Sequence, residues 1–292
     1  MSTIQFFAIT LSGITPLPIP KGAQTIHDLF DDLKLGVYTT FCTFEHNKFL
    51  YLDAHLDRLQ NSVNLMGWDY PLDQHHLRQV IHQLCTAYPQ QNSQGNSRVR
   101  LDVLAEPPTT PPGSETSRLT IALSPFPSVP PELYTQGVEV GFADHLHRDR
   151  PLIKDAHFVL QRRSYQSGSY YEQLLIDENG NILEGMTSNF YGIRDGVLYT
   201  AGAGVLEGVA RRIVLQQAEK LGIPVRLEAI HINDIANLNE AALSSSSRAL
   251  VPIVKIGGQI IGNGRPGPIT RQILEAYRAF LTREIRPAIT NR

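Results

Sequence analysis

Apolar residues recur with two different spacings along the chain, and the spacing distinguishes expected strands from expected helices. Residues 36–51 form two β-prone runs around a polar turn, which predicts a β-hairpin. From Asp53 onward the apolar positions follow helical spacing as far as Gly67. This pattern predicts an amphipathic helix that Asp53 caps and Gly67 terminates. A second helix with the same spacing is expected over residues 73–89.

The strictest alternation lies just after the second helix, where charged residues occupy every second position. Arg98, Arg100 and Asp102 would share one face of a strand, and apolar residues would share the other. We therefore expect a half-buried strand whose charged face meets solvent. Three further segments of this half fit regular structure: a strand at 5–11, a helical piece at 26–33 and a strand at 119–124.

Four prolines among residues 125–131 cannot continue a helix or a central strand. We expect this segment to link an N-terminal domain at 1–124 to a C-terminal domain at 132–292. The pattern of the second half predicts these elements: strands at 137–142, 171–177 and 224–230, helices at 156–167 and 268–280, and a hairpin at 251–261.

Composition restricts the possible partners of the chain. The net charge is −2 and Lys and Arg form no cluster, which argues against nucleic acid as a ligand. Cys42 and Cys85 lie far apart in apolar segments and predict neither a disulfide framework nor a metal site. No apolar run is long enough to cross a bilayer, and residues 4–11 do not resemble a signal peptide. We expect a cytoplasmic protein with a small-molecule substrate.

Residues 182–212 hold the strongest chemical signal. They predict strand, turn, strand, glycine loop and helix, and the free N–H groups at the start of such a helix can bind an anion. One interpretation is a dinucleotide loop made by Gly202, Gly204 and Gly208, with Glu228 twenty residues beyond as the ribose ligand. Against this interpretation, the preceding strand is short and no second βαβ half follows.

The other interpretation is a site for a phosphorylated aldehyde cofactor. Such a cofactor needs a lysine for covalent attachment, an acid facing its ring nitrogen and an anion site for its phosphate. Lys154 follows an apolar Pro-Leu-Ile, a setting that can lower the pKa of the amine by desolvation. Glu184 is the candidate acid. The helix start, the serine run 244–247 and Arg58 are candidates for the anion site.

Five sequence blocks support the second interpretation together. In order along the chain they are Pro-Leu-Ile-Lys at 151–154, Leu-Glu-Gly-Met-Thr-Ser-Asn-Phe at 183–190, Gly-Val-Leu-Glu-Gly-Val-Ala-Arg at 204–211, the serine-rich block 240–252, and Gly-Arg-Pro-Gly-Pro at 264–268. This order and spacing resemble the class IV aminotransferases, the fold-type IV pyridoxal 5′-phosphate (PLP) enzymes, over nearly all of residues 36–280. The resemblance implies a mixed α+β fold with a small N-terminal α/β domain, a larger C-terminal domain, PLP between them, and a homodimer.

The resemblance also implies a role for each matching residue. Lys154 resembles the Schiff-base lysine, Glu184 the acid that faces the pyridine nitrogen, and Arg58 the helix arginine that contacts the phosphate. Two more groups match the family's phosphate-binding positions: the helix start at Gly208, Val209 and Ala210, and a second turn at Ser245 and Ser246.

The reaction is less firmly indicated than the cofactor. Branched-chain and D-amino acid aminotransferases carry glutamate where Thr39 stands, whereas the pair Thr39-Thr40 resembles several aminodeoxychorismate lyases. We therefore prefer a 4-amino-4-deoxychorismate lyase that yields 4-aminobenzoate and pyruvate. The alternative is an amino acid aminotransferase, branched-chain or D-specific, with a 2-oxo acid acceptor. Four residues are candidate substrate contacts: Tyr38, Thr39, His145 and His147.

Overall fold

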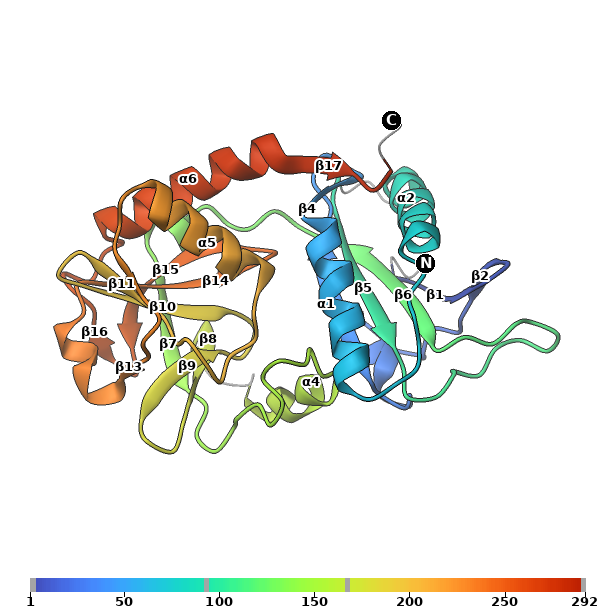
Figure 1. Cartoon of the computed structure of the whole chain (residues 1–292), viewed down its shortest axis with the longest axis horizontal. Helices are drawn as coiled ribbons and strands as arrows, with labels where there is room; N and C mark the ends of the chain where they lie inside the picture. The colour runs from blue at the N-terminus through green and yellow to red at the C-terminus, as the bar shows by residue number, and fades with distance from the viewer. Residues whose placement is uncertain (1–3, 92–94, 166–168, 290–292) are drawn as a thin grey trace. The chain divides into compact units, whose positions relative to one another are not determined.

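The chain folds into two compact units, as a computed structural model shows (Figure 1). The structure describes residues 4–91, 95–165 and 169–289. The three segments of unit 1 are Met1–Ser128, Ile153–Val159 and Glu284–Arg292, and the two segments of unit 2 are Val129–Leu152 and Leu160–Arg283. No helix among the described residues is long and apolar enough to cross a membrane.

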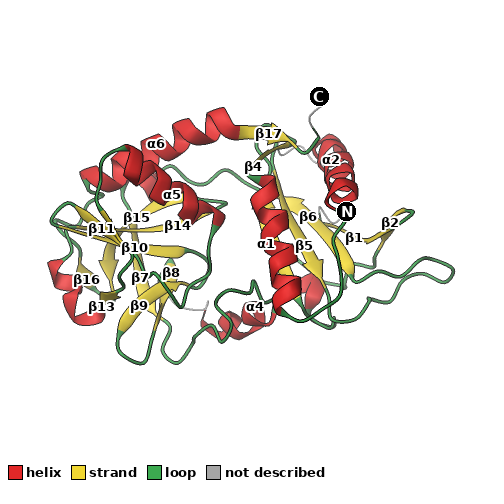
Figure 2. Ribbon diagram, in the orientation of Figure 1, coloured by secondary structure: helices red, strands yellow, loops and turns green. Residues whose placement is uncertain are grey.

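Unit 1 is built on a five-stranded antiparallel sheet in the order β2-β1-β6-β5-β3. Its strands are β1 (Gln5–Thr10), β2 (Gly13–Pro16), β3 (Val37–Cys42), β5 (Ser97–Val103) and β6 (Leu119–Pro125). Apolar residues of helices α1 (Leu52–Leu65) and α2 (Gln74–Gln91) share a core with one face of this sheet (Figure 2). A separate two-stranded sheet pairs β4 (Lys48–Leu50) with β17 (Ile285–Pro287).

The opposite face of the unit 1 sheet is covered as well. Its core joins apolar residues of β1 to Leu29 and Phe30 of a short 3-10 helix, η1 (Asp28–Phe30), and to Ala156 and Val159. These last two residues belong to the segment that returns to unit 1 far along the chain. The sheet is therefore buried on both faces.

Unit 2 contains a ten-stranded mixed sheet in which β9 pairs with both β8 and β10. Its strands are β7 (Val138–Phe142), β8 (Glu172–Ile176), β9 (Asn181–Gly185), β10 (Asn189–Arg194), β11 (Val197–Tyr199), β12 (Val225–Arg226), β13 (Ile230–His231), β14 (Glu240–Ser245), β15 (Ala249–Ile256) and β16 (Gln259–Ile260). Its helical segments are α3 (Glu132–Thr135), η3 (Ile232–Asn237), α5 (Val209–Lys220) and α6 (Pro268–Glu284). The segment that links the units forms α4 (His157–Gln161) and η2 (Arg162–Tyr165).

Most predicted elements form, with differences at their ends. The strand expected at 224–230 is instead two short strands, β12 and β13, with different partners, and the helical piece expected at 26–33 forms only the 3-10 turn η1. Asp73 caps α2 as expected, because its Oδ1 accepts the N–H of His76 at 3.0 Å. The prediction that Asp53 caps α1 is wrong: Tyr51 occupies the cap with φ of 51°, and Asp53 lies in the first turn, where it pairs with Arg78. An acidic residue there still interacts favourably with the helix dipole.

Two other sequence-based expectations also need correction. The helix expected at 156–167 is shorter, because α4 gives way to the 3-10 turn η2 after Gln161; residues 166 and 167 lie outside the described part. The strand β5 is not half-buried, because Arg100 and Asp102 are 1% and 0% exposed. Their charges are compensated within the protein, since the two side chains pair at 2.7 Å.

Candidate active site

In unit 1, the predicted lysine lies on a segment bonded to the edge of strand β3. The backbone N–H of Tyr38 donates to the carbonyl of Lys154 at 2.9 Å, and the N–H of Ala156 donates to the carbonyl of Gly36 at 2.9 Å. The N–H of Lys154 donates to the hydroxyl of Ser62 on α1 at 3.3 Å. These bonds fix the backbone on both sides of the lysine. Its Nζ lies 5.2 Å from the centroid of the Tyr38 ring.

Arg58 lies on α1 of the same unit and contacts two buried groups. Its Nη2 donates to the Thr39 hydroxyl at 3.0 Å and lies 3.5 Å from Nδ1 of His55. The Thr39 hydroxyl is also 3.1 Å from that nitrogen. Burial, followed by the charges of Arg58 and Lys154, holds the pKa of His55 well below its ordinary value. A neutral imidazole can accept a hydrogen bond at Nδ1, so His55 and Thr39 together orient the guanidinium.

In unit 2, Glu184 lies near the end of β9 with its carboxylate buried and held from several directions. Its Oε1 accepts from Nε of Arg148 at 2.9 Å, and its Oε2 accepts from the N–H of Leu206 at 3.2 Å. The amide of Asn189 donates to Oε2 at 3.4 Å and to the carbonyl of Leu206 at 2.9 Å. The side chains of Arg148 and Glu184 are only 6% and 3% exposed, so the guanidinium compensates a buried charge.

The helix start predicted to bind an anion is the first turn of α5. Gly208 is its N-cap, in extended conformation, and as a glycine it provides no side-chain cap for the N–H groups of the first turn. A Cβ at Gly208 would lie 2.3 Å from Oδ1 of Asn189, so only glycine fits beside that amide. The dipole at the start of this twelve-residue helix favours a negative charge.

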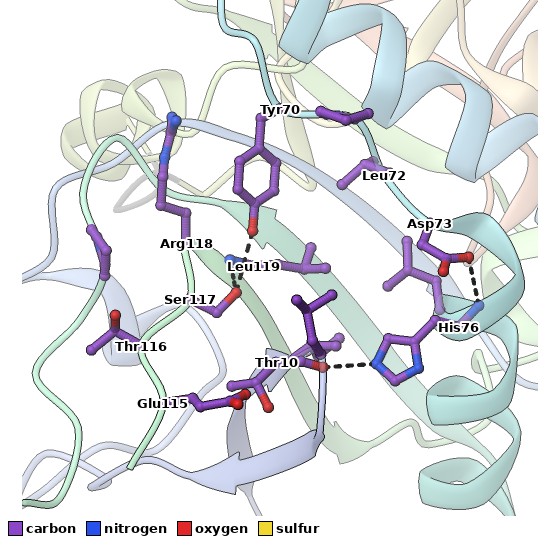
Figure 3. Close-up of a pocket in the computed structure, with 15 residues that line it drawn as sticks. Thr10, Tyr70, Leu72, Asp73, His76, Glu115, Thr116, Ser117, Arg118 and Leu119 are labelled. Atoms are coloured by element: carbon purple, nitrogen blue, oxygen red, sulfur yellow. Dashed lines mark hydrogen bonds between the residues drawn. The ribbon is translucent and has the colours of Figure 1, made fainter. Parts of the chain in front are cut away.

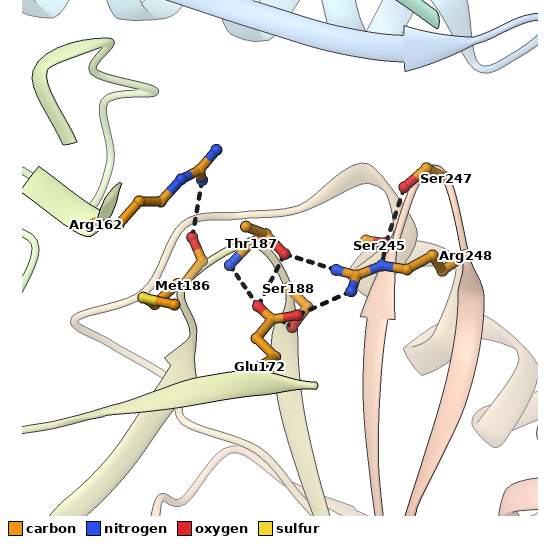
Figure 4. A network of polar contacts seen from close by, with 8 residues as sticks. All are labelled: Arg162, Glu172, Met186, Thr187, Ser188, Ser245, Ser247 and Arg248. Carbon is orange, nitrogen blue, oxygen red and sulfur yellow. Dashed lines mark hydrogen bonds and ion pairs between the residues drawn. The ribbon is translucent and has the colours of Figure 1, made fainter. Parts of the chain in front are cut away.

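The predicted second turn joins β14 to β15. The Oγ of Ser245 accepts from Nε of Arg248 at 3.0 Å, and the hydroxyls of Ser244 and Tyr191 are 2.8 Å apart. Arg248 also pairs with Glu172 of β8 at 3.0 Å (Figure 4). Burial alone would lower the pKa of Arg248, but the negative charge of Glu172 raises it above its ordinary value.

The predicted site residues divide between the two units. Unit 1 holds Tyr38, Thr39, Arg58 and Lys154, and unit 2 holds the remaining ones. The candidate substrate contacts His145 and His147 are exposed, and His147 pairs with exposed Asp149 at 3.2 Å. Sequence reasoning gave no role to four residues that hold the predicted ones in place: His55, Glu172, Asn189 and Arg248. It considered Arg148 only as a ligand for a substrate carboxylate, whereas the structure places Arg148 against Glu184. Asn189 and Arg248 lie inside the motif blocks 183–190 and 240–252, but a block does not show which partner a side chain contacts.

The glycine loop also has the topology that the dinucleotide interpretation requires. Strands β11 and β12 are parallel and α5 connects them, which makes a βαβ crossover. Glu228, the expected ribose ligand, is exposed and pairs with Arg226 at 3.4 Å on the surface. A Cβ at Gly202 would lie 2.7 Å from the carbonyl oxygen of Leu227, so close chain packing explains that glycine.

A cavity of about 710 Å³ lies elsewhere in unit 1 and is lined by none of the predicted residues (Figure 3). Ile9, Leu72 and Leu119 give it apolar walls. At its edges the hydroxyls of Tyr70 and Ser117 are 3.3 Å apart, and His76 donates to the carbonyl of Thr10 at 2.9 Å. These polar groups therefore already have hydrogen-bond partners within unit 1.

Comparison with known proteins identifies the family of the chain. The family model for amino-transferase class IV matches residues 36–256, which is more than half of the 292 residues. A D-alanine aminotransferase of Bacillus licheniformis is 28% identical over 255 residues, covering 85% of this chain and 88% of that protein. A D-alanine aminotransferase of Staphylococcus aureus (strain N315) is 35% identical over 102 residues, which cover 34% of this chain and 36% of that protein.

Solved structures of other proteins share this fold. The branched-chain amino acid aminotransferase from Escherichia coli superposes with a TM-score of 0.74, at 19% identity, and the match covers 98% of this chain and 99% of that one. A second branched-chain amino acid aminotransferase, solved with pyridoxamine 5′-phosphate, gives a TM-score of 0.77 at 18% identity and covers 98% of both chains. At these identities the likeness establishes the fold and leaves the substrate open.

Proposed function

Because the chain belongs to the class IV aminotransferase family, whose members are PLP-dependent transaminases and lyases, we propose that it is an amino acid aminotransferase with a 2-oxo acid acceptor. The alignment with a D-alanine aminotransferase over 85% of the chain carries this proposal. It corrects our sequence-based preference for 4-amino-4-deoxychorismate lyase, since the relatives named above are amino acid aminotransferases. The comparisons likewise replace the dinucleotide interpretation with PLP as the cofactor.

The residues described above fit PLP in charge and in hydrogen bonding. The phosphate is a dianion, and Arg58, the uncapped start of α5 and the serine turn would supply a cation, helix N–H groups and hydroxyls. Lys154 would attach the aldehyde. When bound, PLP supplies an electron sink for the negative charge that develops at the substrate α-carbon.

Glu184 is suited to face the ring nitrogen because its carboxylate is fixed and its charge is compensated. Arg148, Asn189 and the N–H of Leu206 orient the two oxygens. An ionised carboxylate accepts hydrogen bonds only, so in this position it favours a protonated ring nitrogen over a neutral one. We assign Arg148 to the support of Glu184 rather than to the substrate.

Lys154 has two tasks in this proposal. It would hold the cofactor before substrate binds, and its free amine would then act as the base for the proton of the substrate α-carbon. The backbone bonds to Tyr38 and Ser62 keep its backbone fixed, so movement is confined to the four-carbon side chain. A base on a flexible side chain can reach two neighbouring carbons, as amino-group exchange requires.

An assay of substrates tests the proposal. We expect D-alanine and 2-oxoglutarate to give pyruvate only when both are present, with branched-chain L-amino acids as the second series. Lys154→Ala should abolish both turnover and the visible absorption of the PLP-bound protein, whereas Lys255→Ala, at an exposed lysine of unit 2, should change neither. If 4-amino-4-deoxychorismate yields 4-aminobenzoate and pyruvate without an acceptor, the enzyme is a lyase and the proposal is wrong.

A further inference from the structure

In unit 2, the carboxylate of Glu172 connects two turns that carry or adjoin predicted site residues. Its Oε1 accepts from the N–H and the hydroxyl of Thr187 at 2.5 and 2.9 Å, and from the hydroxyl of Ser188 at 3.0 Å. Its Oε2 lies 3.0 Å from Nη1 of Arg248. Glu172 therefore ties the turn after β9, which follows Glu184, to the turn between β14 and β15 (Figure 4).

Arg248 holds its own turn through both backbone and side chain. Its N–H donates to the carbonyl of Ser245 at 3.2 Å, and its Nε donates to the Oγ of the same serine at 3.0 Å. Its Nη2 donates to the hydroxyl of Thr187 at 2.7 Å. The planar guanidinium thus reaches Ser245, Thr187 and Glu172 at once, an arrangement that a lysine could not reproduce.

Burial makes this ion pair costly unless it is fully bonded. The side chains of Glu172 and Arg248 are 3% and 19% exposed. The chain also leaves room for the carboxylate, because a Cβ at Gly185 would lie 2.7 Å from Oε1 of Glu172. A buried pair in which both partners are hydrogen-bonded adds geometric definition more reliably than it adds stability.

The pair also determines how Ser245 can bond to a ligand. A serine hydroxyl has one hydrogen and two lone pairs, and Nε of Arg248 occupies one lone pair. The hydroxyl also lies 3.4 Å from the Oγ of Ser247, and either oxygen can be the donor, so the Ser245 hydrogen can be directed to Ser247 or to a bound anion. The adjacent positive charge strengthens the hydroxyl as a donor, which is what an anionic oxygen requires.

We propose that Glu172 and Arg248 are positioning residues for the phosphate of the cofactor, acting through Ser245. They fix the turn between β14 and β15 against the turn after β9 and present the Ser245 hydroxyl as a hydrogen-bond donor. The inference rests on the proposed function, because it concerns the same cofactor. It adds Glu172 and Arg248 to the site as residues that act on the phosphate through Ser245 and do not contact it themselves.

Comparing two cofactor forms separates phosphate recognition from general folding. PLP and pyridoxal share the ring and the aldehyde, and only PLP carries the phosphate. We expect Arg248→Met to weaken PLP binding about 10-fold or more, the loss of roughly one hydrogen bond to a charged group, and to leave pyridoxal binding within about twofold. Glu172→Gln should shift the ratio of the two affinities in the same direction. Absorbance titration of the apoprotein gives both dissociation constants.

A double-mutant cycle with Ser245→Ala tests the route of the effect. If Arg248 acts through Ser245, the double variant should bind PLP about as weakly as the weaker single variant. Arg226→Met, at an exposed arginine of unit 2, is the matched control and should bind both compounds as wild type does. If Arg248→Met does not fold, the ratio of PLP to pyridoxal affinity in the isosteric variant Glu172→Gln tests the inference instead.

Two results would overturn the inference while leaving the proposed function in place: unchanged PLP affinity in the folded variants, or equal losses for PLP and pyridoxal. A wild-type protein that binds neither compound would instead overturn the proposed function, and the inference with it.

Discussion

At the scale of single residues, the most unusual feature is the buried pair Arg100–Asp102 on β5. The guanidinium donates to both carboxylate oxygens, at 2.8 and 2.7 Å, and lies 3.8 Å from the centroid of the Phe30 ring and 4.5 Å from that of Tyr38. Burial raises the pKa of Asp102, and the charge of Arg100 opposes that shift. Because the Tyr38 ring also contacts the Nζ of Lys154, the pair helps to position this ring beside the predicted catalytic lysine.

Local sequence could not reveal this pair. Alternation along β5 predicts the two faces correctly, but it cannot show what covers each face. The cover over the charged face comes from residues 17–35 and from Ala156 and Val159, whose distance in sequence leaves no local signal. The same limit applies to Arg148, whose partner Glu184 lies 36 residues away. The roles of Lys154 and Glu184 remain predictions, made from the series of motifs that surrounds these two residues.

We expect Asp102→Asn to destabilise the protein by about 3–5 kcal/mol, because it leaves the guanidinium of Arg100 buried without a counter-charge. Urea denaturation of the apoprotein measures this change. Asp69→Asn, at an exposed carboxylate of the same unit, should change stability by less than about 0.5 kcal/mol. A similarly small change for Asp102→Asn would mean that the pair contributes no net stability.

At the scale of elements, one continuous segment from β9 to α5 contains the predicted acid Glu184, its partner Asn189 and the N-cap Gly208 of the predicted anion site. Glu184 is the next-to-last residue of β9, Asn189 is the first residue of β10, and Gly208 is the N-cap of α5. The Asn189 amide bonds to Glu184 and to Leu206, and its oxygen occupies the space where a Gly208 side chain would lie. Sequence predicted the strand, the loop and the helix, because hairpin turns and helix caps are local signals. It did not predict the role of Asn189, which depends on packing.

Gly208→Ala should therefore impair the helix start without creating backbone strain, because φ at this position is −70°. The new Cβ must displace Asn189, and such overpacking typically costs about 1–3 kcal/mol. We expect a lower melting temperature and weaker PLP binding, measured by thermal denaturation and absorbance titration. Gly95→Ala is the control, since its Cβ would meet nothing closer than 3.7 Å. Unchanged PLP affinity in Gly208→Ala would count against the assigned role of this helix start.

At the scale of the whole molecule, the predicted cofactor ligands come from both units. Lys154 and Arg58 belong to unit 1, and Glu184, the start of α5 and the serine turn belong to unit 2. Our proposal gives them a single PLP, so the cofactor would link the stabilities of the two units. A ligand that binds only the folded protein stabilises it by about 2.7 kcal/mol at 100 times its dissociation constant.

Calorimetry of the apoprotein and the PLP-bound protein tests this linkage. We expect PLP to raise the melting temperature, and we expect the rise to shrink both in Arg58→Ala, from unit 1, and in Gly208→Ala, from unit 2. Arg226→Met should leave the rise unchanged. If only the unit 2 substitution reduces the rise, the two sets of residues do not share one cofactor.

The division of unit 1 into three segments also determines when it can be completed during protein synthesis. Strand β4 pairs with β17, and β3 is bonded along its edge by the segment that carries Lys154. A growing chain makes β3, its partner β5 and β4 early, but it makes the segment at the other edge of β3 and the partner of β4 only after residues 154 and 285 have been added. The last residue of unit 2, Arg283, is added before strand β17 of unit 1. Unit 1 therefore receives β17 only after every residue of unit 2 has been synthesised.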